Sequence, residues 1–497
     1  MKNTVLWLLL LLVSACAGSY HPDKIYTSQQ LRKDFGILRQ ALESGHPGMY
    51  LYTSKDSMNY WFERTYQQLD HDMTEREFRV IINPLVSYVR CGHTDVMAPK
   101  AAARYHKKHK IKTMPLQTIV GEGRAWINQN LSNDSTIRKG NELLAVDSLT
   151  VRYLVGRMRD MHTSDGYNIS YKDNIIAGSF PVLYRYLYGD RDSVWVTIRD
   201  SLGQVRSRWI GPKKAQKVAK AAPRPPASPA PTPPKPAAPT SQPPKKLSKA
   251  ERRRTFKFSD KDSTTAVLDI NTFSDNTGKR FYRKTFEQLA QHPQVQNLII
   301  DLRANGGGLS AASADLMSYL LKQPYKYYAS ATARFRKPSF NKYLDQKMSR
   351  LMIRTFFAHP LPNGGMEHRW SGKVFQPRKK YHFDGKVYVL VNGATFSAAS
   401  IFSSVTQGQQ RVTVIGRETG GGRKSCNANF MANLTLPETK ARVRFPLFHL
   451  TFDAPGDDIG HGVFPDIPVK YTSKDLLAAK DLDIEKAYEL IRKSRGN

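Results

Sequence analysis

The stretch "KVYVLVNGATFSAASIF", residues 386–402, indicates the fold class of the C-terminal half of the chain. Its first six residues have the apolar pattern of a strand, small turn-forming residues follow, and a helical pattern begins near Ser397. A serine at such a strand-to-helix turn is either a nucleophile or a plain helix cap, and the cap is the commoner role. The rest of the sequence has to separate the two roles.

Strand and helix patterns alternate throughout residues 256–490. Strands are expected at "TTAVLDINTF", "VQNLIIDL" and "RVTVIG", and helices at "GKRFYRKTFEQLAQ" and "SAASADLMSYLLK". This succession predicts an α/β domain with a largely parallel sheet. Reactive groups of such sheets gather beyond the carboxyl ends of strands, where both Ser397 and the glycines 306–308 fall.

Two further units are expected before this domain. Residues 24–100 have helical spacing, with a cap at Thr27 or Ser28 and a capping box from Thr74 to Glu77. Residues 105–212 contain short apolar runs between glycine-bearing turns, which predicts a mostly β domain. Its segment "IRKGNELLAVDSLTV" resembles PDZ domains, which bind a peptide as an added strand, and any other small β domain is the alternative.

Residues 213–255 are rich in proline, alanine and lysine and have almost no bulky apolar side chains. Such a segment cannot build a core, so we expect a semi-rigid, solvated linker. Its positive charge would suit an anionic lipid or an anionic polymer of the cell envelope.

The N-terminal segment "MKNTVLWLLLLLVSACAGS" has the form of a secretion signal. Its last residues, from Val13 to Cys16, resemble a bacterial lipobox, which implies removal of the leader 1–16 at Cys16 and lipidation of that cysteine. We therefore expect a protein outside the cytoplasm, anchored by lipid in the outer membrane or periplasm. A soluble secreted protein with an incidental cysteine is the alternative.

The overall charge and the cysteines narrow the possible partners. Lysine and arginine number 76 against 42 aspartate and glutamate residues, but an exported protein meets little nucleic acid, so we expect no nucleic-acid partner. Beyond Cys16 there are only Cys91 and Cys426, which either pair or stay free as buried thiols. No metal-ligand spacing occurs in the sequence, so neither a metal nor another cofactor is expected.

Four segments in succession resemble the blocks of the S41 serine peptidases, the C-terminal processing and tricorn-core proteases. They are "LIIDLRANGGG" (298–308), "VLVNGATFSAASIF" (389–402), "VIGRETGGG" (414–422) and "GHGVFPDIPV" (460–469). The resemblance implies a ClpP/crotonase-like α/β core preceded by a helical unit and a PDZ-like domain. It also implies a peptidase that needs no cofactor.

The resemblance assigns roles to particular residues. Ser397 matches the nucleophile, although Ser400 stands where the family has a glutamate. The backbone N–H groups of Gly307, Gly308 and Ala398 would form the oxyanion hole that stabilises the charge on the scissile carbonyl oxygen.

The base differs between branches of the family. Processing proteases use a lysine where this chain has Gly422, with Lys424 two positions later, whereas tricorn-like members use a histidine that His93 in "CGHTDV" matches. We expect His93 to be the base and Lys424 to be the alternative. Activity would then rise through a histidine pKa on the order of 6 to 7.

The acid that orients the histidine is less well matched. Ile459 occupies the aligned position, and we expect the neighbouring Asp458, or Asp457 beside it, to serve after a small shift of their loop. A backbone carbonyl or Thr94 is the alternative partner for His93.

These features predict a serine endopeptidase of the cell envelope that cleaves extended peptides or unfolded protein ends. One alternative is a catalytically impaired relative that binds peptides or acts as a scaffold lipoprotein, as the missing glutamate and acid would suggest. Another is a basic surface-binding protein that acts through its proline- and lysine-rich linker.

Overall fold

This computed structural model describes residues 20–109, 111–213, 253–275, 277–334, 342–345, 352–456 and 460–495. The predicted lipidation site Cys16, the linker after Lys213 and the predicted acid, Asp458 or Asp457, lie outside the described residues. No helix within these ranges is long and apolar enough to cross a membrane.

The central sheet confirms the predicted α/β class. Its strand order is β10 (Arg254–Phe258), β11 (Thr265–Ile270), β12 (Asn297–Asp301), β18 (Lys386–Val391), β19 (Val412–Gly416) and β22 (Ile467–Pro468). Strand β10 is antiparallel to β11, and every other pair is parallel. Both faces are covered, as the uninterrupted apolar run of β18 requires.

Different helices cover the two faces of this sheet. Helices α8 (Gly278–Ala290), α9 (Ser310–Ser318) and α11 (Ala398–Thr406) pack on one face, and α13 (Leu482–Lys493) packs on the other. Alternate residues of each strand enter the two cores, as the pleat of a strand dictates. The turn that carries Ser397 connects the carboxyl end of β18 to α11.

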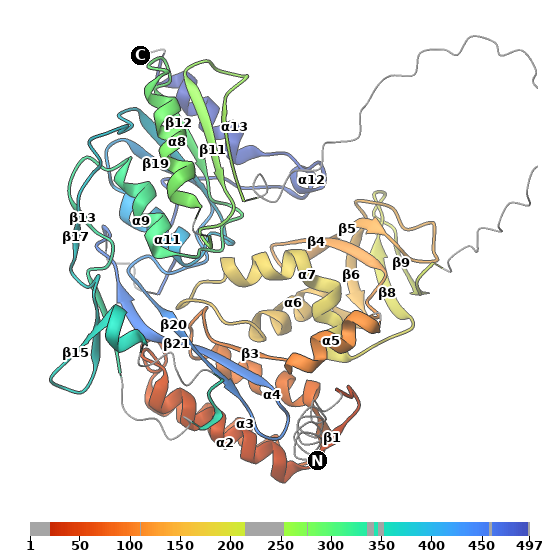
Figure 1. Cartoon of the computed structure of the whole chain (residues 1–497). Coiled ribbons are helices and arrows are strands. Elements are labelled where there is room, and N and C mark those ends of the chain that lie inside the picture. The colour runs from red at the N-terminus through yellow and green to blue at the C-terminus, as the bar shows by residue number, and fades with distance from the viewer. Residues whose placement is uncertain are drawn as a thin grey trace, which may run out of the picture.

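A long hairpin joins the α/β domain to the N-terminal helices (Figure 1). Strands β20 (Ser425–Thr435) and β21 (Arg442–Thr451) lie in a second sheet with β14 (Ser330–Ala333), β16 (Met366–His368) and β15 (Ala358–Pro360). The same hairpin shares a core with α2 (Ser28–Gly45), α3 (Lys55–Gln67) and α4 (Glu75–Ser87). The N-terminal helices thus have no separate core of their own.

Strand β3 (Asp95–Met97) pairs with β21, and this pairing brings the loop of His93 to the C-terminal domain. The predicted caps are confirmed, because Thr27 and Thr74 each cap a helix through a complete capping box. Helices lie where the sequence predicted them in residues 24–100, and β3, near the end of this range, belongs to a sheet shared with the C-terminal half.

The unit at residues 105–212 contains an antiparallel sheet in the order β4 (Leu116–Gly121), β5 (Arg124–Asn130), β6 (Glu142–Val146), β8 (Val194–Arg199) and β9 (Val205–Ile210). Strand β7 (Leu149–Thr150) pairs with β6. Two helices, α6 (Val151–Asp160) and α7 (Ser170–Tyr188), share the core of this sheet. The prediction of a mostly β unit missed α7, because Gly178 and Pro181 interrupt its sequence pattern.

Short elements complete the described chain. They are β1 (Ile25–Tyr26), β2 (Met73–Thr74), α5 (Lys100–Lys108), β13 (Tyr325–Lys326), a π-helical turn at Ile353–Phe357, β17 (Val374–Phe375) and α12 (Ser473–Leu477).

Candidate active site

Ser397 occupies a strained turn between β18 and α11. Its backbone has φ 52° and ψ −124°, a combination that is uncommon for a residue other than glycine. Its side chain makes no capping hydrogen bond, although it stands at the N-cap position. A plain cap therefore does not explain this serine, whereas a sharp strand-to-helix turn is how several hydrolases expose a nucleophile.

Neighbouring segments hold this turn in place. The Thr395 hydroxyl donates to the carbonyl of Leu302 at 2.9 Å, and the Phe396 N–H donates to the carbonyl of Asn305 at 3.0 Å. Ser400, at the position of the family glutamate, donates to the Thr395 carbonyl at 2.7 Å and accepts from the Gly421 N–H at 3.1 Å. Ser400 therefore ties α11 to the loop that follows β19.

The glycine loop after β12 lies against Ser397. A Cβ atom on Gly307 would lie 2.6 Å from Ser397 Cβ and 3.0 Å from the Ala398 nitrogen, so only glycine fits there. The N–H of Gly307, however, donates to Asn305 Oδ1 at 2.9 Å. Of the three predicted donors of the oxyanion hole, the N–H groups of Gly308 and Ala398 make no hydrogen bond within the described chain, so these two are the free donors.

His93 reaches the same place from the loop between α4 and β3. Its ring packs on Phe396, the residue before Ser397, with 4.6 Å between ring centroids. Tyr171 also stacks on Phe396, at 4.5 Å. No hydrogen bond joins His93 to Ser397 Oγ among the described residues, and such bonds often form only when substrate is bound.

The surroundings of His93 keep its imidazole neutral. Part of the side chain reaches solvent, but Nδ1 is buried and has no hydrogen-bond partner among the described residues. Burial, together with the Arg444 guanidinium, lowers the pKa of His93 to about 4, against a smaller opposing effect of the Asn427 backbone. The lowered pKa keeps the imidazole unprotonated at neutral pH, which is what a base requires.

Lys424 is engaged elsewhere. Its Nζ donates to the backbone carbonyl of Ala454, and no hydrogen bond or ion pair joins it to Ser397 or His93 in the described part of the chain. The geometry thus favours His93 over Lys424 as the base.

Asp165 is a site residue that sequence reasoning missed. It lies in the loop after α6, is 2% exposed, and accepts the N–H of Gly92 at 2.8 Å and that of Gly422 at 3.2 Å. Burial raises the pKa of its carboxyl to about 6. Its sequence context, Asp165 followed by Gly166, is typical of an ordinary turn and gave no signal of a role.

Cys91, His93 and Asp165 have ligating atoms within 4.8 Å of one another. Burial raises the pKa of the Cys91 thiol well above its usual value, so the sulfur carries its proton in this structure, and the spacing of these residues matches no metal-binding motif. We therefore assign no metal to this group. Cys91 and Cys426 are both buried and free, which answers the question of their pairing.

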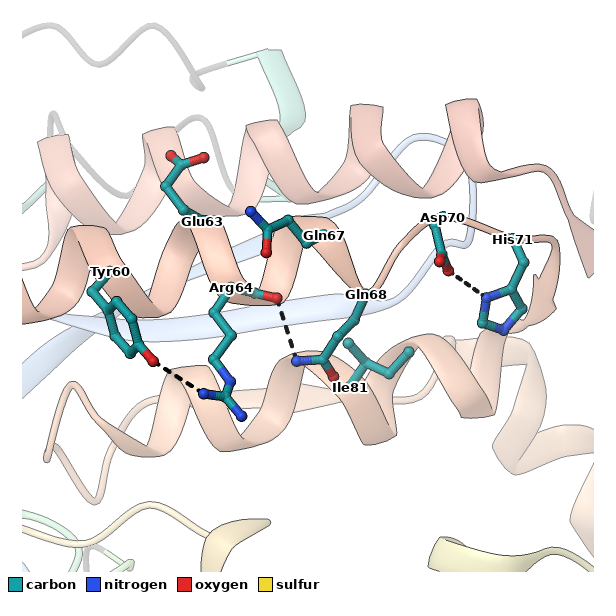
Figure 2. Close-up of a pocket in the computed structure, with 8 residues that line it drawn as sticks. All are labelled: Tyr60, Glu63, Arg64, Gln67, Gln68, Asp70, His71 and Ile81. Atoms are coloured by element: carbon teal, nitrogen blue, oxygen red, sulfur yellow. Dashed lines mark hydrogen bonds and ion pairs between the residues drawn. The ribbon is translucent and has the colours of Figure 1, made fainter.

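A polar hollow of about 790 Å³ lies away from these residues, between α3 and α4 (Figure 2). Its lining shares no residue with the turn of Ser397 or the loop of His93. In it Arg64 donates to the Tyr60 hydroxyl, and His71 contacts Asp70. The hollow therefore plays no part in the candidate active site.

Comparison with known proteins relates the domain that carries Ser397 to a peptidase family. Residues 264–469 match the model of peptidase family S41. Mature CPAF complexed with lactacystin is similar with a TM-score of 0.60 and 16% identity, over 93% of this chain and 97% of that chain. Another structure of mature CPAF has a TM-score of 0.58 and 15% identity, over 90% of this chain and 94% of that chain. For the photosystem II D1 C-terminal processing protease the TM-score is 0.40 and the identity is 13%, over 90% of this chain and 94% of that chain.

The matched domain and its site define a serine-type peptidase. Residues 264–469, which contain all four sequence blocks, match peptidase family S41, as those blocks predicted. The CPAF structures agree with its fold over almost its entire length.

Proposed function

We propose that this chain is a serine endopeptidase in which Ser397 is the nucleophile and His93 is the base. The observation that carries the proposal is the strained turn of Ser397, which makes no cap bond and lies against Gly307 beside two unpartnered N–H groups. The contact of His93 with Phe396 supports its assignment as the base.

The chemistry follows from these positions. As Ser397 Oγ forms a bond to the peptide carbonyl carbon, its proton passes to an unprotonated ring nitrogen of His93, and the carbonyl π electrons move onto oxygen. The N–H groups of Gly308 and Ala398 bind this oxyanion, and loss of one such donor typically costs about 10²- to 10³-fold in kcat. His93 then gives the proton to the leaving amine, and water hydrolyses the acyl-enzyme.

The proposal also covers the location of the enzyme, the type of its core and its substrate. We place the enzyme outside the cytoplasm on a lipid anchor at Cys16, with a ClpP/crotonase-like core and extended or unfolded polypeptide as substrate. The PDZ-like unit would present peptides along its sheet edge. Strand β9 ends the described order of that sheet, and its Val205 and Trp209 are 55% and 62% exposed.

The test is proteolysis of a fluorescently labelled unfolded protein by the purified mature chain. Ser397→Ala and His93→Ala should each lose nearly all turnover, because residues of one catalytic unit fail together. Lys424→Ala should keep most of it. Exposed Ser201 and His71 provide matched alanine controls that should stay active.

Two results would overturn the assignment. Near-normal turnover by Ser397→Ala or His93→Ala would remove that residue from the mechanism. A wild-type chain that neither cleaves nor reacts at Ser397 with an acyl-directed serine probe would support the impaired, peptide-binding alternative.

A further inference from the structure

The loop 163–167 is fastened to both sides of His93. The Thr163 hydroxyl donates to the carbonyl of Thr94 at 2.8 Å, and the Gly166 N–H donates to the carbonyl of Arg90 at 3.0 Å. Between these two anchors Asp165 accepts the N–H of Gly92, the residue next to His93. Loop 163–167 therefore holds the backbone around His93 at three residues, Arg90, Gly92 and Thr94.

The Asp165 carboxylate also faces the ring of His93. A carboxylate oxygen of Asp165 lies within 4.8 Å of a ring nitrogen of His93, and Nδ1 of that ring is buried without an acceptor. A small rotation of the imidazole would let one ring N–H point at the carboxylate. The other ring nitrogen would then carry no hydrogen and could accept a proton from Ser397.

Asp165 is the negatively charged group in these surroundings. The titratable groups that face it are Cys91, Cys426, Tyr52 and Tyr171, and burial raises the pKa of each, so they are neutral at pH 7. Beside His93 lies the positive Arg444, whose strand position pairs with Asp95 of β3. The Asp95 carboxyl lies beside Arg444, whereas the Asp165 carboxylate lies within 4.8 Å of the His93 ring and is placed to oppose the charge of an imidazolium.

We infer that Asp165 is the residue that positions His93 and stabilises its imidazolium form, the role that the sequence assigned to Asp458. The inference rests on the proposed function, in which His93 is the base. Asp165 keeps its charge and takes no proton during the reaction, as expected for the acid of such a triad. The unit at residues 105–212 would then contribute directly to the active site.

The test compares Asp165→Asn and Asp458→Asn with a matched control, Asp34→Asn. Asp34 is also a buried aspartate that accepts two backbone N–H groups, from Glu438 at 3.0 Å and Thr439 at 2.8 Å, but it lies in α2. Asp165→Asn should lower kcat by about 10²- to 10⁴-fold with KM little changed. Asp34→Asn and Asp458→Asn should keep most of the rate.

The pH dependence of kcat distinguishes a role of Asp165 in positioning His93 from a role in supporting the fold alone. Wild-type kcat should fall as the pH drops through about 6, where Asp165 takes up a proton. Asp165→Asn should show no such step. Histidine NMR gives a readout that needs no turnover: Asp165→Asn should shift the His93 titration to lower pH, because the favourable charge is gone.

The inference fails if Asp165→Asn keeps wild-type kcat, or if Asp458→Asn alone loses it. It also fails if the His93 titration is the same with and without the Asp165 charge. These results are distinct from failure of the proposed function, which would appear as activity that persists in Ser397→Ala or His93→Ala.

Discussion

Replacing Asp165 with asparagine should raise the free energy of unfolding at neutral pH. Burial raises the pKa of this carboxyl from 3.8 to about 6. The folded protein therefore binds the proton more tightly than the unfolded chain, and this stabilising contribution is fully present below about pH 4 and lost as the pH rises through about 6. At about 1.4 kcal/mol per pKa unit, the ionised carboxylate lowers stability by about 3 kcal/mol above pH 6.

Asparagine removes the charge but keeps one acceptor. It can still accept the Gly92 N–H, whereas the Gly422 N–H loses its partner, at a cost of about 1 to 2 kcal/mol. The net gain for Asp165→Asn at pH 7.5 should thus be about 1 to 2 kcal/mol. At pH 4.5 the wild-type carboxyl is largely protonated, so this gain should disappear.

The assay is urea unfolding of both proteins at pH 7.5 and pH 4.5, followed by tryptophan fluorescence. Burial lowers the pKa of His46 to about 3 and of His162 and His368 to about 4, so their stabilising contribution is present above pH 6.5 and lost in acid. These losses occur in both proteins and cancel in the difference. A variant that is less stable than wild type by the same amount at both pH values would refute the reasoning, because the carboxylate would then be a structural anchor.

Three further predictions concern the anchor, the linker and cofactors. Wild-type protein should partition with membranes and Cys16→Ala should not, since lipidation needs that thiol; a soluble wild type would contradict the anchor. Limited proteolysis should cut first between Lys213 and Arg254, because this stretch has almost no core-forming side chains, and first cuts elsewhere would mean that it is protected. Incubation with a metal chelator should leave turnover unchanged, as expected for serine and histidine chemistry, and a loss reversed by added Zn²⁺ would require a metal.

Local patterns were enough to predict most of the α/β domain. Strands β11, β12, β18 and β19 lie where short apolar runs end in glycine or asparagine, and the helices between them have clear 3.6-residue periodicity. Thr27 and Thr74 were readable as caps because a capping box needs only a glutamine or glutamate three residues later. Ser397 and His93 were found because each lies within a short motif.

Other features depend on contacts between distant residues and leave no local signal. Strands β20 and β21 complete the core of the N-terminal helices, although about 350 residues separate them from α4. The N–H of Gly307 was expected to be a free donor, and only the folded loop shows that Asn305 takes it. Asp165 could not be predicted from the sequence for the same reason, since its two hydrogen-bond partners are backbone groups of the distant residues Gly92 and Gly422.

The candidate site is therefore built from all three units of the chain. The α/β domain supplies Ser397, the N-terminal unit supplies His93, and the β-rich unit supplies Asp165. Further contacts join these units beside those of Asp165: the Thr163 hydroxyl donates to the carbonyl of Thr94, the Asn168 side chain donates to the carbonyl of Thr419, and the Tyr171 ring stacks on Phe396.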